Sequence, residues 1–342
     1  TSTANTTGSN NVAVGARALL NNRVSNNTAV GTGALQANTT GTNNDAFGAY
    51  SLYSNTTGIQ NVAVGYTTLY YNTTGSQNTA LGYAALTNNT GSNNTAMGLS
   101  AMQSNTTGYD NTGLGRIALA GNTTGYQNVA VGGNAMYANT TGYNNTAVGY
   151  QALTTNSVGI SNVAVGAAAL AANTASYNTA VGHGAMQTNT TGTPNDAFGY
   201  QALNANTTGS QNVAIGTQSL KTNVTGSYNT AVGYNALTLN TAGYNTAVGT
   251  AALQNTSTGA NNTAMGYSAL YANTTGGENI AIGDSALKAN TTGTRNIAIG
   301  NNALISNVSG IQNVAVGYMA LYSNSTTVSY THLRAHETRE DL

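Results

Sequence analysis

The sequence has 342 residues, of which only 5% are charged, and its formal net charge is zero. It has no basic stripe that could neutralise phosphates, which argues against nucleic acid as a partner. It also has no cysteine, which excludes a disulfide framework and a thiolate metal site, and no apolar run approaches the roughly 20 residues of a membrane helix.

One phrase, Asn-x-Ala-apolar-Gly, recurs nineteen times from Asn11–Gly15 to Asn313–Gly317, once with Gly113 in place of Ala. Successive closing glycines are 17 residues apart, or 16 in four places. A short fixed period is typical of a solenoid, in which each repeat is one coil stacked on the last. We therefore predict an all-β parallel β-solenoid, or β-roll, of about nineteen 16–17-residue coils across residues 1–327.

Each coil contains the same elements in the same order. The Asn-x-Ala-apolar-Gly phrase predicts a strand, because Thr or Val, both β-branched, usually precedes Ala. Thr28 and Val30 would share one face of this strand, and Asn27, Ala29 and Gly31 the other. The Ala-Leu pair that follows does not alternate and fits either a short helical turn or a corner. An Asn-Thr-Thr-Gly turn closes the coil, and the Ala, Val and Leu columns are expected to form a thin core.

Asparagine occupies two fixed columns of the repeat. It stands four residues before the closing Gly in all nineteen copies, and seven after it in eighteen, Thr256 being the exception. Stacked in register, each column becomes a ladder whose side-chain amides bond the coils above and below, and each bond nets about 1 kcal/mol. Predicted ladder residues of the first column include Asn61, Asn128, Asn145, Asn162, Asn212 and Asn313.

The sequence also has a longer period of 151 residues. Asn44–Gly48 recurs 151 residues later as Asn195–Gly199, and two of the four 16-residue coils recur at the same interval. Copying a block of coils lengthens a fibre without changing its cross-section, whereas an active site gains nothing from it. Catalysis needs side chains of different chemistry close together, whereas this chain has rows of identical side chains. We predict no enzyme, cofactor or metal, and an exposed position for His183, the only histidine inside the repeats.

Tyrosines are the best candidates for binding. Rows of partly exposed Tyr can stack on sugars or on another protein, although packing between neighbouring coils or protomers is the favoured interpretation. Seven candidate ligand contacts directly follow a closing Gly: Tyr66, Tyr83, Tyr150, Tyr200, Tyr234, Tyr267 and Tyr318. A second set lies near the other turn: Tyr109, Tyr126, Tyr143, Tyr177, Tyr228 and Tyr244.

The repeat stops at the C-terminal end of the sequence. Val328–Thr338 resembles the in-frame translation of a transposase-type sequencing adapter, so residues 328–342 are expected to be a non-native or unstructured tail. A natural, divergent tail is the alternative. Because the sequence begins inside a repeat, we expect it to be a piece of a longer fibre.

The repeat phrase, most closely in Gln211–Gly216, resembles the head repeat of YadA-type trimeric autotransporter adhesins from Asn11 to about Asn324. This resemblance implies a left-handed β-roll that forms a homotrimer on a bacterial surface, with membrane contact only through an outer-membrane anchor that is missing here. The present coils are longer than those of that family and carry a regular Asn-Thr-Thr-Gly turn. Similar longer repeats look like the shafts of phage tail fibres, which belong to a virion.

The expected function is therefore that of an extracellular adhesive fibre segment, a head or stalk that attaches to a host-surface protein or glycan receptor. A phage tail-fibre shaft is the alternative. An ice-binding solenoid is a remote alternative, because the Thr pair of the turn is adjacent and its members point in different directions. The thin core also favours a homo-oligomer, since burial of a second face would stabilise it.

Overall fold

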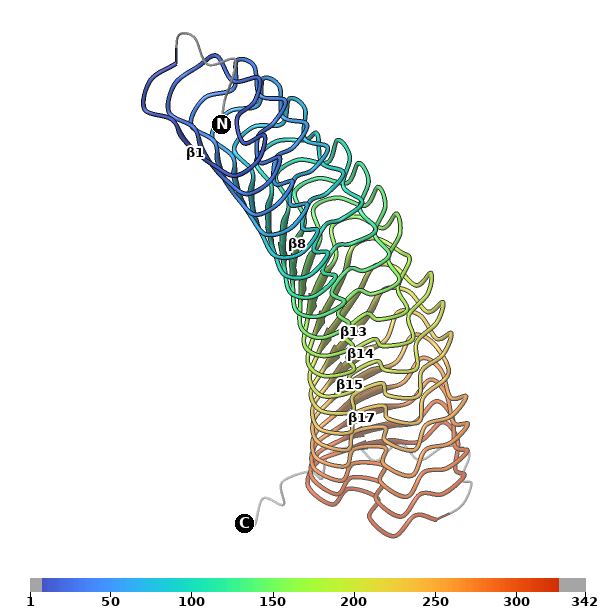
Figure 1. Cartoon of the computed structure of the whole chain (residues 1–342). Helices are drawn as coiled ribbons and strands as arrows, with labels where there is room; N and C mark the ends of the chain where they lie inside the picture. Colours follow the sequence, from blue (N-terminus) through green and yellow to red (C-terminus); the bar gives the residue numbers. More distant parts are fainter. Residues whose placement is uncertain (1–7, 326–342) are drawn as a thin grey trace, which may run out of the picture. The chain divides into compact units, whose positions relative to one another are not determined.

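The computed structural model describes residues 8–325 and divides the chain into two compact units, Thr1–Thr191 and Gly192–Leu342. The predicted tail, residues 328–342, lies outside the described residues. Both units are parallel β-solenoids, as predicted, and each coil contributes one short strand (Figure 1). The strands of the first unit are β1 (Val12–Val14), β2 (Thr28–Val30), β3 (Asp45–Phe47), β4 (Val62–Val64), β5 (Thr79–Leu81), β6 (Thr95–Met97), β7 (Thr112–Leu114), β8 (Val129–Val131), β9 (Thr146–Val148), β10 (Val163–Val165) and β11 (Asn178–Val181). Those of the second are β12 (Asn195–Phe198), β13 (Asn212–Ile215), β14 (Thr230–Val232), β15 (Thr246–Val248), β16 (Thr263–Met265), β17 (Ile280–Ile282), β18 (Ile297–Ile299) and β19 (Val314–Val316).

Consecutive strands within a unit pair in parallel and in register. Ala46 of β3 lies opposite Ala63 of β4, and Ala63 lies opposite Ala80 of β5. The closing glycine ends each strand with φ between +126° and +140°, a backbone conformation that residues with a Cβ rarely adopt. The chain therefore leaves the sheet at the same point in every coil, which keeps equivalent residues stacked.

The two faces of the strand differ in burial. The Asn and Ala side chains point inward and are buried, as at Asn61 and Ala63, whereas the residues between them point outward. The predicted apolar column before the closing Gly is therefore not part of the core: Phe47 and Met97 are both 42% exposed. The inward side has room only for Ala, because the buried Leu or Met of the next segment fills the interior. At Gly113, an added Cβ would lie 2.8 Å from Cγ of Met102.

The Ala-Leu segment forms a corner, and no helix forms anywhere in residues 8–325. The helical-turn alternative is therefore wrong. Thr67 and Leu69 both have φ of +52°, with Thr68 between them outside this region, and alternation of this kind cannot build a helix. The Leu69 N–H instead donates to the carbonyl of Ala85 in the next coil at 3.1 Å. Stacking of the coils thus provides the backbone hydrogen bonds that a helix would have formed within itself.

Both asparagine columns form hydrogen-bonded ladders through the interior. Asn61 Nδ2 donates to Asn44 Oδ1 at 3.0 Å and to the carbonyl of Gly75 at 2.9 Å, while Asn61 Oδ1 accepts from the backbone N–H of Asn78 at 3.0 Å. In the second ladder, Asn72 Nδ2 donates to Asn55 Oδ1 and to the same Gly75 carbonyl, each at 2.9 Å. Six first-column residues singled out from the sequence are at most 1% exposed: Asn61, Asn128, Asn145, Asn162, Asn212 and Asn313.

The 16-residue coils connect the two ladders directly. In such a coil, Asn94 Nδ2 donates to Asn89 Oδ1 at 3.1 Å, and Asn245 Nδ2 donates to Asn240 Oδ1 at the same distance. These coils are one residue shorter in the turn between the two asparagine columns. The two side-chain amides of one coil therefore come within hydrogen-bond distance. The sequence showed the short coils but not this connection.

Candidate functional site

The seven tyrosines that follow a closing Gly are all exposed, between 47% and 74%. Tyr66 and Tyr83 lie on adjacent coils, with ring centroids 5.5 Å apart and ring planes inclined by 18°. The other five are Tyr150, Tyr200, Tyr234, Tyr267 and Tyr318, and none has a tyrosine at the equivalent position of an adjacent coil. The structure therefore brings together only two of the seven candidate ligand contacts.

Tyrosines near the other turn stack on one another along the solenoid. The ring of Tyr126 lies 5.0 Å from that of Tyr109 and 4.7 Å from that of Tyr143, with nearly parallel planes. In the second unit, Tyr228 and Tyr244 stack at 4.8 Å. These rings pack neighbouring coils together through their faces, as Tyr66 and Tyr83 do with a larger tilt.

Four tyrosines that sequence analysis did not single out join Tyr66 and Tyr83 in a cluster. Tyr50 lies edge-on to Tyr66, with centroids 6.2 Å apart, and Tyr53 stacks on Tyr70 at 5.0 Å. Tyr71 meets Tyr70 edge-to-face at 4.6 Å. The available signal was local density, because six of the 21 tyrosines fall within residues 50–83. The sequence analysis missed it, because it considered only the tyrosines that directly follow a closing Gly or lie near the other turn, and these four lie two, five or six residues after a closing Gly.

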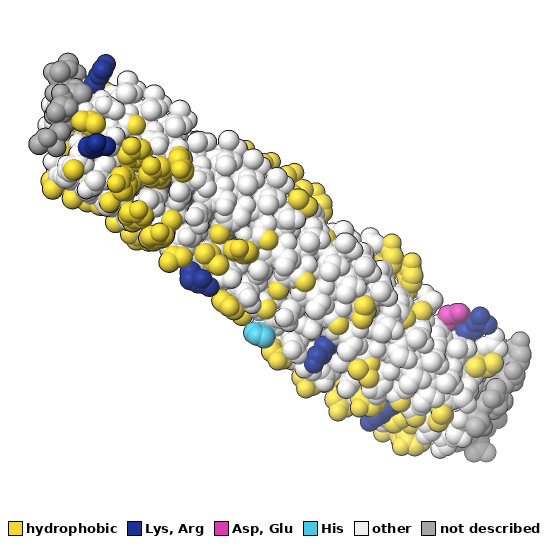
Figure 2. Space-filling model, turned by 45° about the vertical axis from the view of Figure 1, so that its right-hand side comes forward, with side chains coloured by type: hydrophobic (Ala, Val, Ile, Leu, Met, Phe, Trp, Pro, Cys, Tyr) yellow, Lys and Arg dark blue, Asp and Glu magenta, His cyan; other side chains and the backbone are white. Residues whose placement is uncertain are grey.

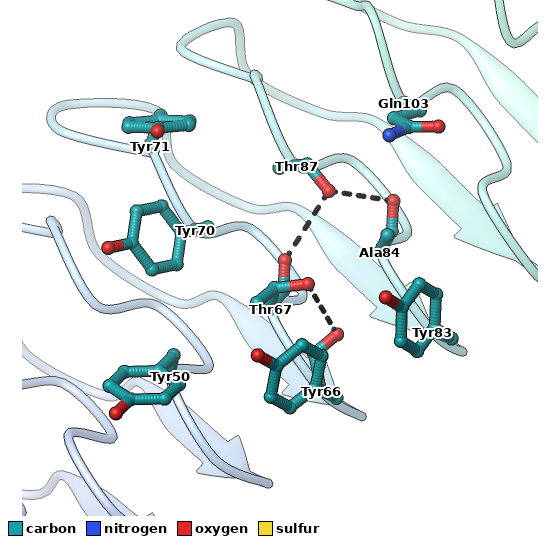
Figure 3. A pocket seen from close by; sticks show the side chains of 9 residues that line it. All are labelled: Tyr50, Tyr66, Thr67, Tyr70, Tyr71, Tyr83, Ala84, Thr87 and Gln103. Atoms are coloured by element: carbon teal, nitrogen blue, oxygen red, sulfur yellow. Dashed lines mark hydrogen bonds between the residues drawn. The ribbon is translucent and has the colours of Figure 1, made fainter.

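These side chains line an open groove of about 410 Å³, here called the tyrosine groove: Tyr50, Tyr66, Thr67, Tyr70, Tyr71, Tyr83, Ala84, Thr87 and Gln103. The residues that follow the closing glycines, Tyr66 and Tyr83, form one wall, and Tyr70 with Thr87 forms the other (Figure 3). Thr67 and Ala84 lie between the walls. Part of the groove is a feature of the corner, since hollows near Ile117 and Gln151 are also lined by residues two, five and six positions after the closing glycines. Neither of these hollows has a wall like that of Tyr66 and Tyr83.

Polar groups within the groove are anchored by the backbone. Thr87 Oγ1 donates to the carbonyl of Ala84 at 2.8 Å and lies 3.4 Å from that of Thr67. Thr67 Oγ1 donates to the carbonyl of Tyr66 at 2.9 Å. These bonds hold the threonine oxygens in place as acceptors. The five tyrosine hydroxyls and the Gln103 amide add both donors and acceptors.

No charged side chain lines the tyrosine groove. The main electrostatic effect is on Tyr70, whose pKa is raised by burial and, to a smaller extent, by the neighbouring Tyr53 and Tyr71. This shift favours the protonated phenol, which is a hydrogen-bond donor. On the face of the molecule shown in Figure 2, charged side chains are few and scattered.

Residues 8–325 contain no cluster of three or more His, Cys, Asp or Glu side chains that could hold a metal ion. His183 is exposed. No helix in the described part of the chain is long and apolar enough to cross a membrane.

No protein-family model matches this chain, and no curated protein sequence matches it significantly.

Proposed function

We propose that this chain is a segment of an extracellular attachment fibre in which copies pack together through the outward faces of their strands. The supporting observation is the exposed apolar column immediately before the closing glycines. In the first unit it runs through strands β1–β11, with residues such as Phe47, Leu81, Met97 and Val148 between 37% and 42% exposed.

Exposing such an apolar face to water is unfavourable in free energy. Eleven strands about 4.8 Å apart carry it over about 48 Å, and large contiguous apolar patches mark interaction sites on soluble proteins. The neighbouring outward column is mostly Thr or Val, as in Thr79, Thr95 and Val129, so the face carries little charge. A second copy of this chain presents the same apolar rows at the same spacing, and it is therefore the partner that best complements this face.

The number of copies follows from the resemblance to trimeric adhesin heads, and the proposal is a homotrimer at a bacterial surface that attaches to a protein or glycan receptor. A phage tail-fibre shaft would use the same packing. Ice binding is disfavoured by the outward face itself. Asp45 and Phe47 of β3 beside Val62 and Val64 of β4 give neighbouring strands unequal heights and polarity, whereas a surface that matches ice must be flat.

Light scattering coupled to size exclusion tests the assembly. We expect a mass three times the 34.4 kDa of one chain. The double variant Val131→Lys/Val148→Lys places two charges on the outward face of β8 and β9 and should shift the mass toward one chain while the circular dichroism spectrum stays unchanged. Thr124→Lys, at an exposed turn position, is the control and should remain assembled. A folded monomer at micromolar concentration would refute the trimer.

A further inference from the structure

We infer that the tyrosine groove is a binding site for a neutral oligosaccharide. This inference deepens the proposed attachment function and rests on it, since it names the class of receptor that the fibre would hold. It depends on four observations: the orientation of the rings, the anchored polar groups, the uncharged lining, and the loss of the rings in the copied block of coils.

The rings offer flat apolar surfaces. In Figure 3 the rings of Tyr66, Tyr70 and Tyr83 are seen nearly face-on. Tyr66 and Tyr83 stack on each other with ring centroids 5.5 Å apart and planes inclined by 18°, a step similar to the length of one pyranose unit along a glycan chain. The C–H groups on one side of a sugar ring carry partial positive charge and pack on the electron-rich face of an aromatic ring. Adjacent coils therefore supply platforms for adjacent sugar units.

The polar groups are of the kind that sugar hydroxyls need. Thr67 between the walls and Thr87 in one wall offer fixed acceptor oxygens, and Gln103 offers an amide at one end of the groove. Binding sites for small polar ligands combine apolar walls with a few positioned polar groups in this way. Because none of the lining residues is charged, nothing compensates a carboxylate or sulfate on the ligand, and a neutral glycan is favoured.

The copied block provides an internal comparison. Adding 151 to the residue numbers of the groove gives the equivalent positions in the second unit, where Tyr50, Tyr66, Tyr70 and Tyr71 are replaced by Gln201, Thr217, Lys221 and Thr222. Tyr234, Thr238 and Gln254 retain the residue types of Tyr83, Thr87 and Gln103.

The backbone of the hollow is preserved in the copy. Thr238 Oγ1 donates to the carbonyl of Asn235 at 2.8 Å and lies 3.4 Å from that of Gln218, the same two bonds that Thr87 makes. The coil therefore forms with or without the aromatic residues. Because the fold does not require these tyrosines, they are free to serve recognition.

The groove is lined by other residues than those of the proposed packing face. Its residues follow the closing glycines, whereas the apolar column precedes them on the outward side of the strand. Assembly through the strands would therefore bury other side chains than these, and a trimer would present three grooves. Three weak sites that bind one glycan-bearing surface together gain avidity.

Isothermal titration calorimetry with maltohexaose and with chitohexaose, both neutral, tests the inference on the full chain. The double variant Tyr66→Thr/Tyr71→Thr introduces the residues that the copied block carries at these positions, so it should fold normally. We expect at least one of the two sugars to bind, and the double variant to weaken this binding about tenfold or more. Tyr150→Thr removes an exposed tyrosine outside the groove and should leave affinity unchanged.

Grafting provides the converse test. The variant Gln201→Tyr/Thr217→Tyr/Lys221→Tyr/Thr222→Tyr rebuilds the cluster in the second unit and should double the number of sites per chain. The inference is overturned if neither neutral sugar binds at millimolar concentration, if the Tyr66→Thr/Tyr71→Thr variant binds as well as the parent chain, or if only an acidic glycan such as hyaluronan hexasaccharide binds. Light scattering on the same samples separates the two proposals: a trimer that binds no sugar overturns only the glycan site, and a monomer that binds sugar overturns only the assembly.

Discussion

Glycine is irreplaceable at one position of the coil and dispensable at its neighbour. Gly132 ends strand β8 with φ of +132°, and a Cβ there would lie 2.6 Å from the carbonyl oxygen of Gly149 in the next coil. Gly133 lacks such a φ, and a Cβ there would touch only the ring of Tyr150, at 3.5 Å. The closing glycine is thus required by close backbone approach as well as by its dihedral angle.

This difference predicts opposite outcomes for adjacent substitutions. Gly132→Ala should lower the free energy of unfolding by about 3 kcal/mol or more, from the strained φ and the overlap with the next coil. Gly133→Ala should change it by less than about 1 kcal/mol. Urea denaturation followed by circular dichroism measures both, and similar shifts in the two midpoints would contradict the close-approach argument.

The asparagine ladders predict a large cost for one lost amide. Asn145 makes four hydrogen bonds: its Nδ2 donates to Asn128 Oδ1 and the Gly159 carbonyl, and its Oδ1 accepts from the backbone and side-chain nitrogens of Asn162. Asn145→Ala leaves buried partners unsatisfied on both sides and should cost about 3 kcal/mol or more. Gln151→Ala, at a partly exposed position, should stay within about 0.5 kcal/mol. Equal melting shifts would rule out the ladder as a source of stability.

Tyr70 predicts a loss of stability at alkaline pH. Burial and neighbouring tyrosines raise the pKa of its phenol above 10.0 in the folded chain. The protonated phenol is therefore favoured by folding, so this contribution is fully present below pH 10.0 and is lost as pH rises through the folded pKa. Tyr70→Phe should lose less stability than the parent chain between pH 10 and pH 11. Melting temperatures across that range measure the difference, and identical alkaline losses would contradict the assigned cause.

At the scale of the strand, the period-two pattern correctly predicted which residues share a face, and the 17-residue spacing predicted the parallel coil. Neither pattern indicated which neighbouring elements cover each face of the strand. Val, Ile and Phe next to the closing Gly look like core residues by composition, yet the interior is already filled by Leu and Met from the corner. The corner itself was ambiguous because Leu in the left-handed region is locally unfavourable and is adopted only through bonds to the next coil.

The corrected strand orientation predicts unequal costs for two truncations in one coil. Leu153 is fully buried and Val148 is 37% exposed. Leu153→Ala should cost about 2–5 kcal/mol at any protein concentration, whereas Val148→Ala should cost less than about 1 kcal/mol in a dilute sample. An additional cost at Val148 that grows with protein concentration would report burial between copies. If the Val148 variant were as unstable as the Leu153 variant in dilute solution, the apolar column would have to be part of the core.

The candidate site shows a similar limit of sequence reasoning. Tyr66 and Tyr83 were found from their place in the repeat, whereas Tyr50, Tyr70 and Tyr71 were missed because they come from other columns. Their meeting depends on how the corner folds, since Tyr50, two positions after Gly48, converges there with residues five and six positions after Gly65. A consensus sequence of the repeat omits residues that occur in only some coils. A site built from such residues is recognised only when the coils are stacked in the structure.

The whole molecule is held together by uncharged groups, which predicts an unusual response to salts. In residues 8–325 the ion pair between Arg295 and Glu278, at 2.9 Å, is exposed on both sides, and such pairs contribute little to stability. Ladders, backbone bonds and apolar burial are not screened by electrolyte. Raising sodium chloride from about 0.05 to 0.5 M, which shortens the screening length several-fold, should therefore shift the melting temperature by less than about 2 °C. Sodium sulfate at equal ionic strength should raise it, because sulfate strengthens apolar burial. Differential scanning calorimetry measures both responses, and a marked fall in chloride would mean that charge pairing contributes to the fold.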